Sequence, residues 1–376
     1  MAAWTDKVLR WRPPGVLTQG PLPAYALVLG LTAVAAMLVF GNDERRPPLV
    51  EAEVPPTLSM PALAPQRIVG SLKLPARPAG QPLTNFRTLS PADRNDLIEV
   101  TPNGQRLPKI AASGWMPWIA YARRYDPDGP PARVGLLMIN LGANEAVMKR
   151  AIDELPGEVS LAFLAATPDL PKWQKRAREH GHESYLMLPI DNPEGLAERG
   201  VKPIEAAALP DENVRRLRAA MARGEGYMGF VLAEPGPASQ AEEIAQPLTQ
   251  EIADRGLAVI EINPTPSGTA LYRLAGELGV GYARSSTVLD YRLAGRTVAG
   301  NLDRLVEWTG ETQPDRVPRH DFGVLQPNDA AIDAIVAWRK KLWHQNAVSF
   351  VPIIGHFECR ATCMARLRAQ PAQLRP

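Results

Sequence analysis

The hydrophobic pattern between residues 133 and 355 alternates short apolar runs with longer amphipathic stretches. The stretches, such as "NEAVMKRAIDELP" and "DAAIDAIVAWRKKLW", repeat apolar residues at spacings of three and four, as helices with one buried face do. The runs are apolar enough for strands buried on both faces, which predicts a parallel sheet covered by helices. The eight runs are 133–142, 159–167, 184–191, 226–233, 256–263, 281–290, 321–327 and 347–355.

The number of these units narrows the fold within the α/β class. Eight strand–helix units over roughly 220 residues fit a distorted (β/α) barrel of seven or eight strands. A doubly wound open sheet is the alternative, but no glycine-rich GxGxxG motif follows the first run to favour it. We therefore expect a barrel that binds ligands at the carboxyl ends of its strands.

An uncharged segment of 19 residues, "LPAYALVLGLTAVAAMLVF", lies ahead of the barrel pattern at 22–40. At about 1.5 Å per residue, a helix of this length spans a hydrocarbon core of about 30 Å. Lys7, Arg10 and Arg12 precede it with only Asp6 opposing them, which favours a cytoplasmic N-terminus. A cleaved signal peptide is the alternative, although "AVAA" is followed by further apolar residues rather than by a polar start. We expect a single-pass anchor in the inner (cytoplasmic) membrane.

A proline-rich region separates this anchor from the barrel pattern. Of the 38 prolines, 16 fall between Pro47 and Pro131, and the first half of that region lacks apolar periodicity, as an extended spacer does. The predicted order is a cytoplasmic N-terminus (1–21), a transmembrane helix (22–40), a periplasmic linker (41–95), the barrel domain (96–358) and a C-terminal tail (359–376).

Charge and cysteine content exclude several classes of protein. The formal net charge of +2, from 42 basic and 40 acidic residues, gives no reason to expect a nucleic-acid partner. Two cysteines, Cys359 and Cys363, cannot form a disulfide framework, but in an oxidising compartment they could pair as a local disulfide. Two free thiols are an equal alternative. Zinc binding with His356 is less supported because a fourth ligand is not evident.

Polar residues near the predicted carboxyl ends of the strands are the candidate site. Four of them are expected to bind substrate: Asn140, Asp191, Asn263 and Gln326. Three others could act as catalytic groups or rebuild a metal site: Asp290, Glu234 and His356. A solvated loop residue or a helix cap is the competing interpretation for Glu234 and Asp290.

Several short segments follow one another in a recognisable order over residues 107–354, among them "LPKIAASGWMPWIAYARRYDPDGPPARVGLLMINLG", "GYMGF" and "LTQEIADRGLAVIEIN". In this order they resemble the divergent polysaccharide deacetylase family of bacterial envelopes. The resemblance implies a distorted (β/α) barrel related to carbohydrate esterases, which remove acetyl groups from glycans with the help of a divalent metal. The preceding segment, with Trp115 and Trp118, is expected to plug or strap the barrel, although a sugar-stacking platform is the alternative.

Three positions depart from the pattern that the resemblance implies. Ile139 and Asn140 stand where the family has an aspartate pair, and Ala233 stands where it has a histidine. Gln326 replaces the histidine of a His-Pro pair. An asparagine amide cannot accept a proton at neutral pH, and a divalent metal needs two or three convergent ligands, so no resident metal is expected.

We therefore expect an envelope protein that has lost catalysis and binds a glycan or a periplasmic protein partner. Whether the chain is an enzyme is left open by the sequence. The alternative is an active, zinc-dependent glycan deacetylase whose metal is held by relocated groups such as Glu234, Asp290 and His356.

Overall fold

The computed structural model describes residues 89, 92–125, 129–191, 200–263, 269–290, 297–311, 319–342, 348–358 and 363. The chain divides into two compact units, Met1–Leu63 and Ala64–Pro376, and all described residues belong to the second. The predicted transmembrane segment 22–40, nearly all of the linker and the tail apart from Cys363 lie outside the described residues. Among the described residues, each helix falls short of the length and apolarity that a membrane span requires.

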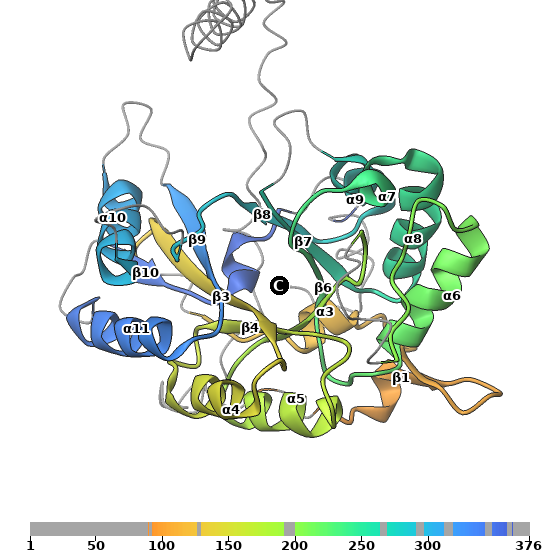
Figure 1. Ribbon diagram of the computed structural model, residues 1–376, viewed down its shortest axis with the longest axis horizontal. Helices are drawn as coiled ribbons and strands as arrows, with labels where there is room; N and C mark the ends of the chain where they lie inside the picture. The colour runs from red at the N-terminus through yellow and green to blue at the C-terminus, as the bar shows by residue number, and fades with distance from the viewer. Residues whose placement is uncertain are drawn as a thin grey trace, which may run out of the picture. The chain divides into compact units, whose positions relative to one another are not determined.

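The second unit is built on a parallel sheet that curls into a nearly closed barrel (Figure 1). Its strands follow one another in chain order, and the last returns to pair with the first. An isolated bridge between Val288 and Val324 joins the two remaining edges. The seven strands are β3 (Arg133–Leu141), β4 (Ser160–Phe163), β5 (Ser184–Met187), β6 (Gly229–Leu232), β7 (Ala258–Ile262), β8 (Tyr282–Ser285) and β9 (His320–Leu325).

The predicted barrel is confirmed with seven strands. The eighth apolar run, 347–355, does not form the full barrel strand that the pattern predicts. That run forms the two-residue strand β10 (Ser349–Phe350), which pairs with the start of β3, and then the 3-10 turn η7 (Ile353–His356). Pro352 has no amide hydrogen with which to continue the ladder, so the chain leaves the sheet there. The open-sheet alternative is wrong because β9 pairs with β3 along six residues on one side and the chain after β8 bridges to it at Val324 on the other.

Helices cover the outside of the ring, each packing against its neighbours (Figure 1). Polar side chains begin several of them: Asn144, Thr269 and Thr297 each accept a backbone N–H of the first turn. The helices are α4 (Glu145–Glu154), α5 (Leu170–Glu179), α6 (Pro210–Met221), α7 (Pro237–Gln240), α8 (Glu242–Asp254), α9 (Ala270–Leu278), α10 (Val298–Gly310) and α11 (Asp329–Leu342).

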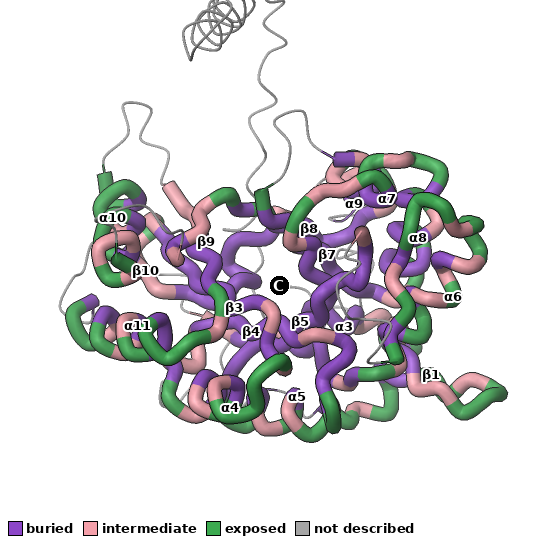
Figure 2. Tube along the Cα trace, viewed as in Figure 1, coloured by how far each residue is buried: buried purple, intermediate pink, exposed green. Residues whose placement is uncertain are grey.

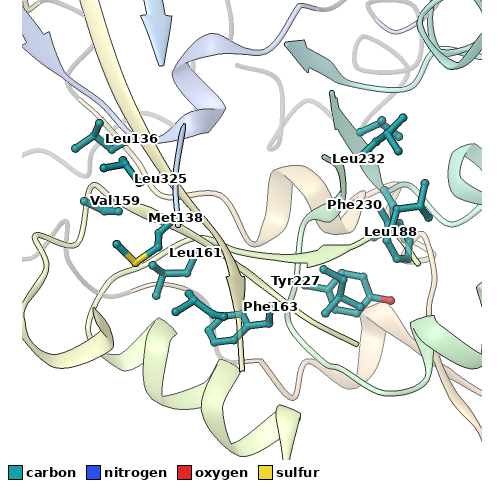
Figure 3. Packing of buried hydrophobic residues seen from close by; sticks show 14 of the residues in the cluster. Leu136, Met138, Val159, Leu161, Phe163, Leu188, Tyr227, Phe230, Leu232 and Leu325 are labelled. Atoms are coloured by element: carbon teal, nitrogen blue, oxygen red, sulfur yellow. The ribbon is translucent and has the colours of Figure 1, made fainter. Parts of the chain in front are cut away.

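Alternation along the strands divides the buried side chains into two cores. On β3, Leu136 and Met138 point outward into the cluster under the helices (Figure 3), whereas Leu137 and Ile139 point into the barrel. The ring of strands is accordingly buried on both sides (Figure 2). This is why the strands are mainly apolar instead of alternating regularly with polar residues.

Segments from before and after the barrel fill its interior at the amino ends of the strands. The short helix α3 (Pro117–Ala120) and the turn η7 both belong to the inner core. Trp118, with 1% of its surface exposed, lies 5.5 Å from the ring of Phe357 and packs against Gly281. The N-terminal segment is therefore a plug, as the strap interpretation of the sequence expects. A small antiparallel hairpin of β1 (Ile98–Val100) and β2 (Arg106–Pro108) precedes it.

One fully buried carboxylate, Glu183, ties this plug to the barrel. Oε1 accepts the backbone N–H of Arg123 at 3.0 Å, and Oε2 accepts the hydroxyl of Ser160 at 2.9 Å. Oε2 also accepts the Tyr185 hydroxyl and the backbone N–H of Ile354, each at 3.2 Å. Burial raises the pKa of Glu183 above its ordinary value, against the opposing effect of these four donors.

Replacing Glu183 with alanine should destabilise the domain strongly, because it leaves two backbone N–H groups and two hydroxyls buried without their acceptor. We expect a loss of about 2–4 kcal/mol in the free energy of unfolding, measured by urea titration. Glu158→Ala is the matched control, since that carboxylate is partly exposed and should cost at most about 1 kcal/mol. Equal losses in the two variants would contradict the assigned role of Glu183.

His356 is the second buried polar residue of the inner core. Its side chain packs on Gly135, where an added Cβ would come 2.6 Å from Nε2, and beside the ring of Phe322. Neither ring nitrogen has a hydrogen-bond partner within the described part of the chain. Burial lowers the pKa of His356 well below its ordinary value, and the neighbouring His320 and Arg133 add to this effect.

The stability of the domain should therefore fall as the pH drops below about 6.5. The unfolded chain takes up a proton on His356 near that pH while the folded chain does not, so acid favours unfolding. Between pH 7.5 and 5.5 we expect wild type to lose about 1 kcal/mol more than His356→Leu, measured by urea unfolding at both pH values. Identical pH dependence in the two proteins would show that folding leaves the pKa of His356 unchanged, which contradicts its burial as a neutral side chain.

Candidate functional site

The mouth of the barrel is the end where the carboxyl termini of the strands meet, and three predicted residues come together there. Asn140 is the penultimate residue of β3, Gln326 follows β9, and Asp290 follows the bridge after β8. The Asn140 side-chain amide donates to Gln326 Oε1 at 3.0 Å. The backbone N–H of Gln326 donates to Asp290 Oδ2 at 2.6 Å. We call these three residues the seam site, because they lie where β3, β8 and β9 close the barrel.

Polar groups below the seam site hold the edges of β8 and β9 together. The Ser285 hydroxyl donates to the carbonyl of Phe322, and the Thr287 hydroxyl donates to Asp321 Oδ2, each at 2.6 Å. Burial raises the pKa of Asp321 above its ordinary value. Sequence reasoning missed these groups, although the polar letters "SST" inside the apolar run 281–290 were their signal.

Three of the four predicted substrate-binding residues have a left-handed backbone. The φ angles are 58° at Asn140, 53° at Asp191 and 51° at Asn263. Asparagine and aspartate tolerate this region better than other residues with a Cβ, so the chain can change direction at the register shift in β3, in the loop after β5 and directly after β7. Such conformations are common where a fold positions a site.

Asp191 uses its carboxylate for structure instead of leaving it open to a ligand. Its oxygens accept the backbone N–H groups of Ala238 at 2.9 and 3.0 Å and of Ser239 at 3.1 Å. These groups lie at the start of α7, and Gly236 leaves no space there for a side chain beside the carboxylate. Asp191 therefore holds α7 against the loop that follows β5. Its carboxylate caps the start of that helix, the role that the sequence offered as an alternative for Glu234 and Asp290.

Glu234 and Asn263 follow the neighbouring strands β6 and β7 and are both exposed. Val231 and Ala233 belong to the inner core and Leu232 to the outer one, so alternation directs Glu234 away from the barrel axis. The Asn263 side chain makes no hydrogen bond within the described residues, and β7 is separated from β3 by β8 and β9 on the shorter way around the ring. Neither residue joins the seam site.

The floor of the mouth is apolar. Ile139, Met187 and Ile262 are buried there at the ends of β3, β5 and β7, and Ala233 and Val288 pack against them partly exposed. Ala233 thus adds to the floor at the position where the resemblance implied a histidine. A ligand at the mouth would lie over hydrocarbon and meet polar atoms at the rim.

The structure does not bring Glu234, Asp290 and His356 together. His356 lies inside the barrel near the amino end of β3, not at the mouth as expected, because η7 turns inward below the strands. Among the described residues, no group of three histidine, cysteine, aspartate or glutamate side chains could hold a metal ion. Cys363 is buried in the inner core, whereas Cys359 lies outside the described residues, so their disulfide stays a prediction.

A buried carboxylate that the sequence pattern did not reveal, Glu261 on β7, also lies apart from the mouth. It accepts the hydroxyls of Thr269, at 2.5 Å, and of Tyr282, and burial raises its pKa above the ordinary value. Its strand neighbours Ile260 and Ile262 face inward, so Glu261 points toward the start of α9. These contacts join β7, β8 and the start of α9, and they occupy both oxygens of Glu261, so this carboxylate is a structural group.

Comparison with one solved structure supports the fold. An uncharacterized protein, ATU2773, from Agrobacterium tumefaciens C58 superposes with a TM-score of 0.58 at 25% identity, covering 66% of this chain and 98% of that one. A candidate cellobiose-phosphate cleavage protein from Enterococcus faecalis V583 gives a TM-score of 0.40 at 9% identity, covering 58% and 97%. A search of curated proteins found no match.

The family comparison covers the barrel itself. The family model of the divergent polysaccharide deacetylases matches residues 137–354, from the middle of β3 to η7. That span includes the seam site, the part of the inner core that the strands contribute and six complete strands of the ring. The chain belongs to the divergent polysaccharide deacetylase family.

Proposed function

We propose that this protein binds a glycan of the bacterial envelope at the mouth of its barrel and does not hydrolyse it. The observation that carries the proposal is the seam site, where two neutral amides and one carboxylate converge over an apolar floor. Amide groups orient sugar hydroxyls by donating and accepting hydrogen bonds, and hydrocarbon beneath them suits the C–H face of a sugar ring.

The same atoms give little support to hydrolysis. A general base must accept a proton from the attacking water, and the amides of Asn140 and Gln326 cannot do so. Asp290 is the single carboxylate of the seam site, and one of its oxygens already accepts the backbone N–H of Gln326. A divalent metal usually needs two or three convergent charged or imidazole ligands, and among the described residues Asp290 belongs to no group of three such side chains.

Titration calorimetry on the full chain tests this function, with neutral and N-acetylated oligosaccharides as probes and released acetate measured in parallel. We expect saturable binding of at least one oligosaccharide and no acetate above the buffer control, with or without added zinc. Acetate release that depends on zinc and is abolished by Asp290→Ala would instead establish the relocated deacetylase.

Variants distinguish binding from support of the fold in the same experiment. Asn140→Ala should weaken oligosaccharide binding because it removes one of the two side-chain amides of the seam site. Asp191→Ala should lower the free energy of unfolding by about 1–2 kcal/mol, since it leaves the start of α7 without its acceptor. Glu234→Gln, at an exposed carboxylate directed outward, should change neither quantity.

We further propose that the protein is anchored in the inner membrane by residues 22–40, with the barrel in the periplasm. The uncharged segment of 19 residues and the cations ahead of it support this arrangement. Alkaline phosphatase fused after residue 358 should be active in a Gram-negative host and should sediment with membranes. Activity in the soluble periplasmic fraction would show instead that the segment is cleaved as a signal peptide.

A further inference from the structure

We propose that the seam site recognises two adjacent hydroxyl groups of a neutral sugar ring. This inference rests on the proposed glycan-binding function and adds the chemical class of the ligand. It follows from the atoms of Asp290, Asn140 and Gln326 that their mutual contacts leave available.

Within the described residues, three polar groups of the seam site have no partner. Asp290 uses Oδ2 for the backbone N–H of Gln326, which leaves Oδ1 as a charged acceptor. The contact between the Asn140 and Gln326 side chains uses one amide nitrogen and one amide oxygen. In either orientation of the two amides, one NH2 group and one carbonyl oxygen remain.

These groups are held in place before a ligand arrives. The left-handed backbone of Asn140 and the bridge between Val288 and Val324 bring their three chain segments together. Asn328 also contacts the carbonyl of Gln326 at 3.3 Å, while its Oδ1 accepts the backbone N–H of Ala331 in α11. A site that is already assembled loses less entropy on binding.

The remaining donors and acceptors match adjacent hydroxyls better than other sugar groups. Each hydroxyl both donates and accepts, so one can donate to Asp290 Oδ1 while the amide NH2 donates to its neighbour. A phosphate or carboxylate on the ligand would be repelled by Asp290. A bare cation would find one carboxylate and neutral oxygens, a weaker set than divalent metals usually have.

Two oligosaccharide probes separate this ligand class from other glycans. Cellotetraose carries adjacent free hydroxyls on every ring, whereas N-acetylated chitotetraose has an acetamido group in place of one of them. We expect calorimetry on the full chain to give tighter binding for cellotetraose. Asp290→Asn should weaken that binding about tenfold or more, because it replaces a charged acceptor with a neutral one.

Glu234→Gln is the matched control, since it removes one exposed carboxylate charge from the loop after β6, a strand that is not next to β3, β8 or β9 in the ring, without touching the seam site. Gln326→Ala, at an exposed position, is the second variant and should also weaken cellotetraose binding. Thermal unfolding midpoints equal to wild type confirm that the folds are intact.

Each result decides between defined interpretations. Binding of cellotetraose that Asp290→Asn and Gln326→Ala leave unchanged overturns the assignment of the seam site but not the proposed function. Preference for N-acetylated chitotetraose overturns the ligand class alone. Loss of cellotetraose binding after EDTA shows recognition through a cation and also overturns the inference. Failure of every oligosaccharide to bind overturns the proposed function itself.

Discussion

The buried carboxylate of Glu183 is the contact on which the rest of the barrel depends. Its two oxygens accept four donors, which come from the segment before the barrel, from β4, from β5 and from η7. Burying a carboxylate without hydrogen-bond partners costs free energy, so the four donors together make the burial of Glu183 possible. With this end of the barrel closed by the plug, the opposite end is free to carry polar groups with other uses.

The two ends of the barrel therefore differ in what their polar residues do. Glu183 and the carbonyl contacts of Arg123 and Arg178 hold chain segments together at the amino ends of the strands. At the mouth, the seam site keeps part of its hydrogen-bonding capacity open. The contacts of the plug thus rest on residues other than the seam site, and the ring can keep its architecture when groups of the seam site change.

Much of the fold was predictable because burial on both faces leaves long apolar runs in the sequence. Seven of eight runs became barrel strands, and three polar residues at their ends, Asn140, Asp290 and Gln326, meet as expected of one mouth. The direction of single side chains was harder to predict. Asp191 turns onto α7 and His356 lies inside the barrel, because contacts distant in sequence determine both positions.

The plug also sets the order in which the domain can be completed. One Glu183 oxygen meets Arg123 from before the first barrel strand, and the other meets Ile354 from after the last. A ribosome must therefore release nearly the whole domain before this contact closes. Until then the inner core is unfinished, so contacts between the two ends of the domain can form only late in folding.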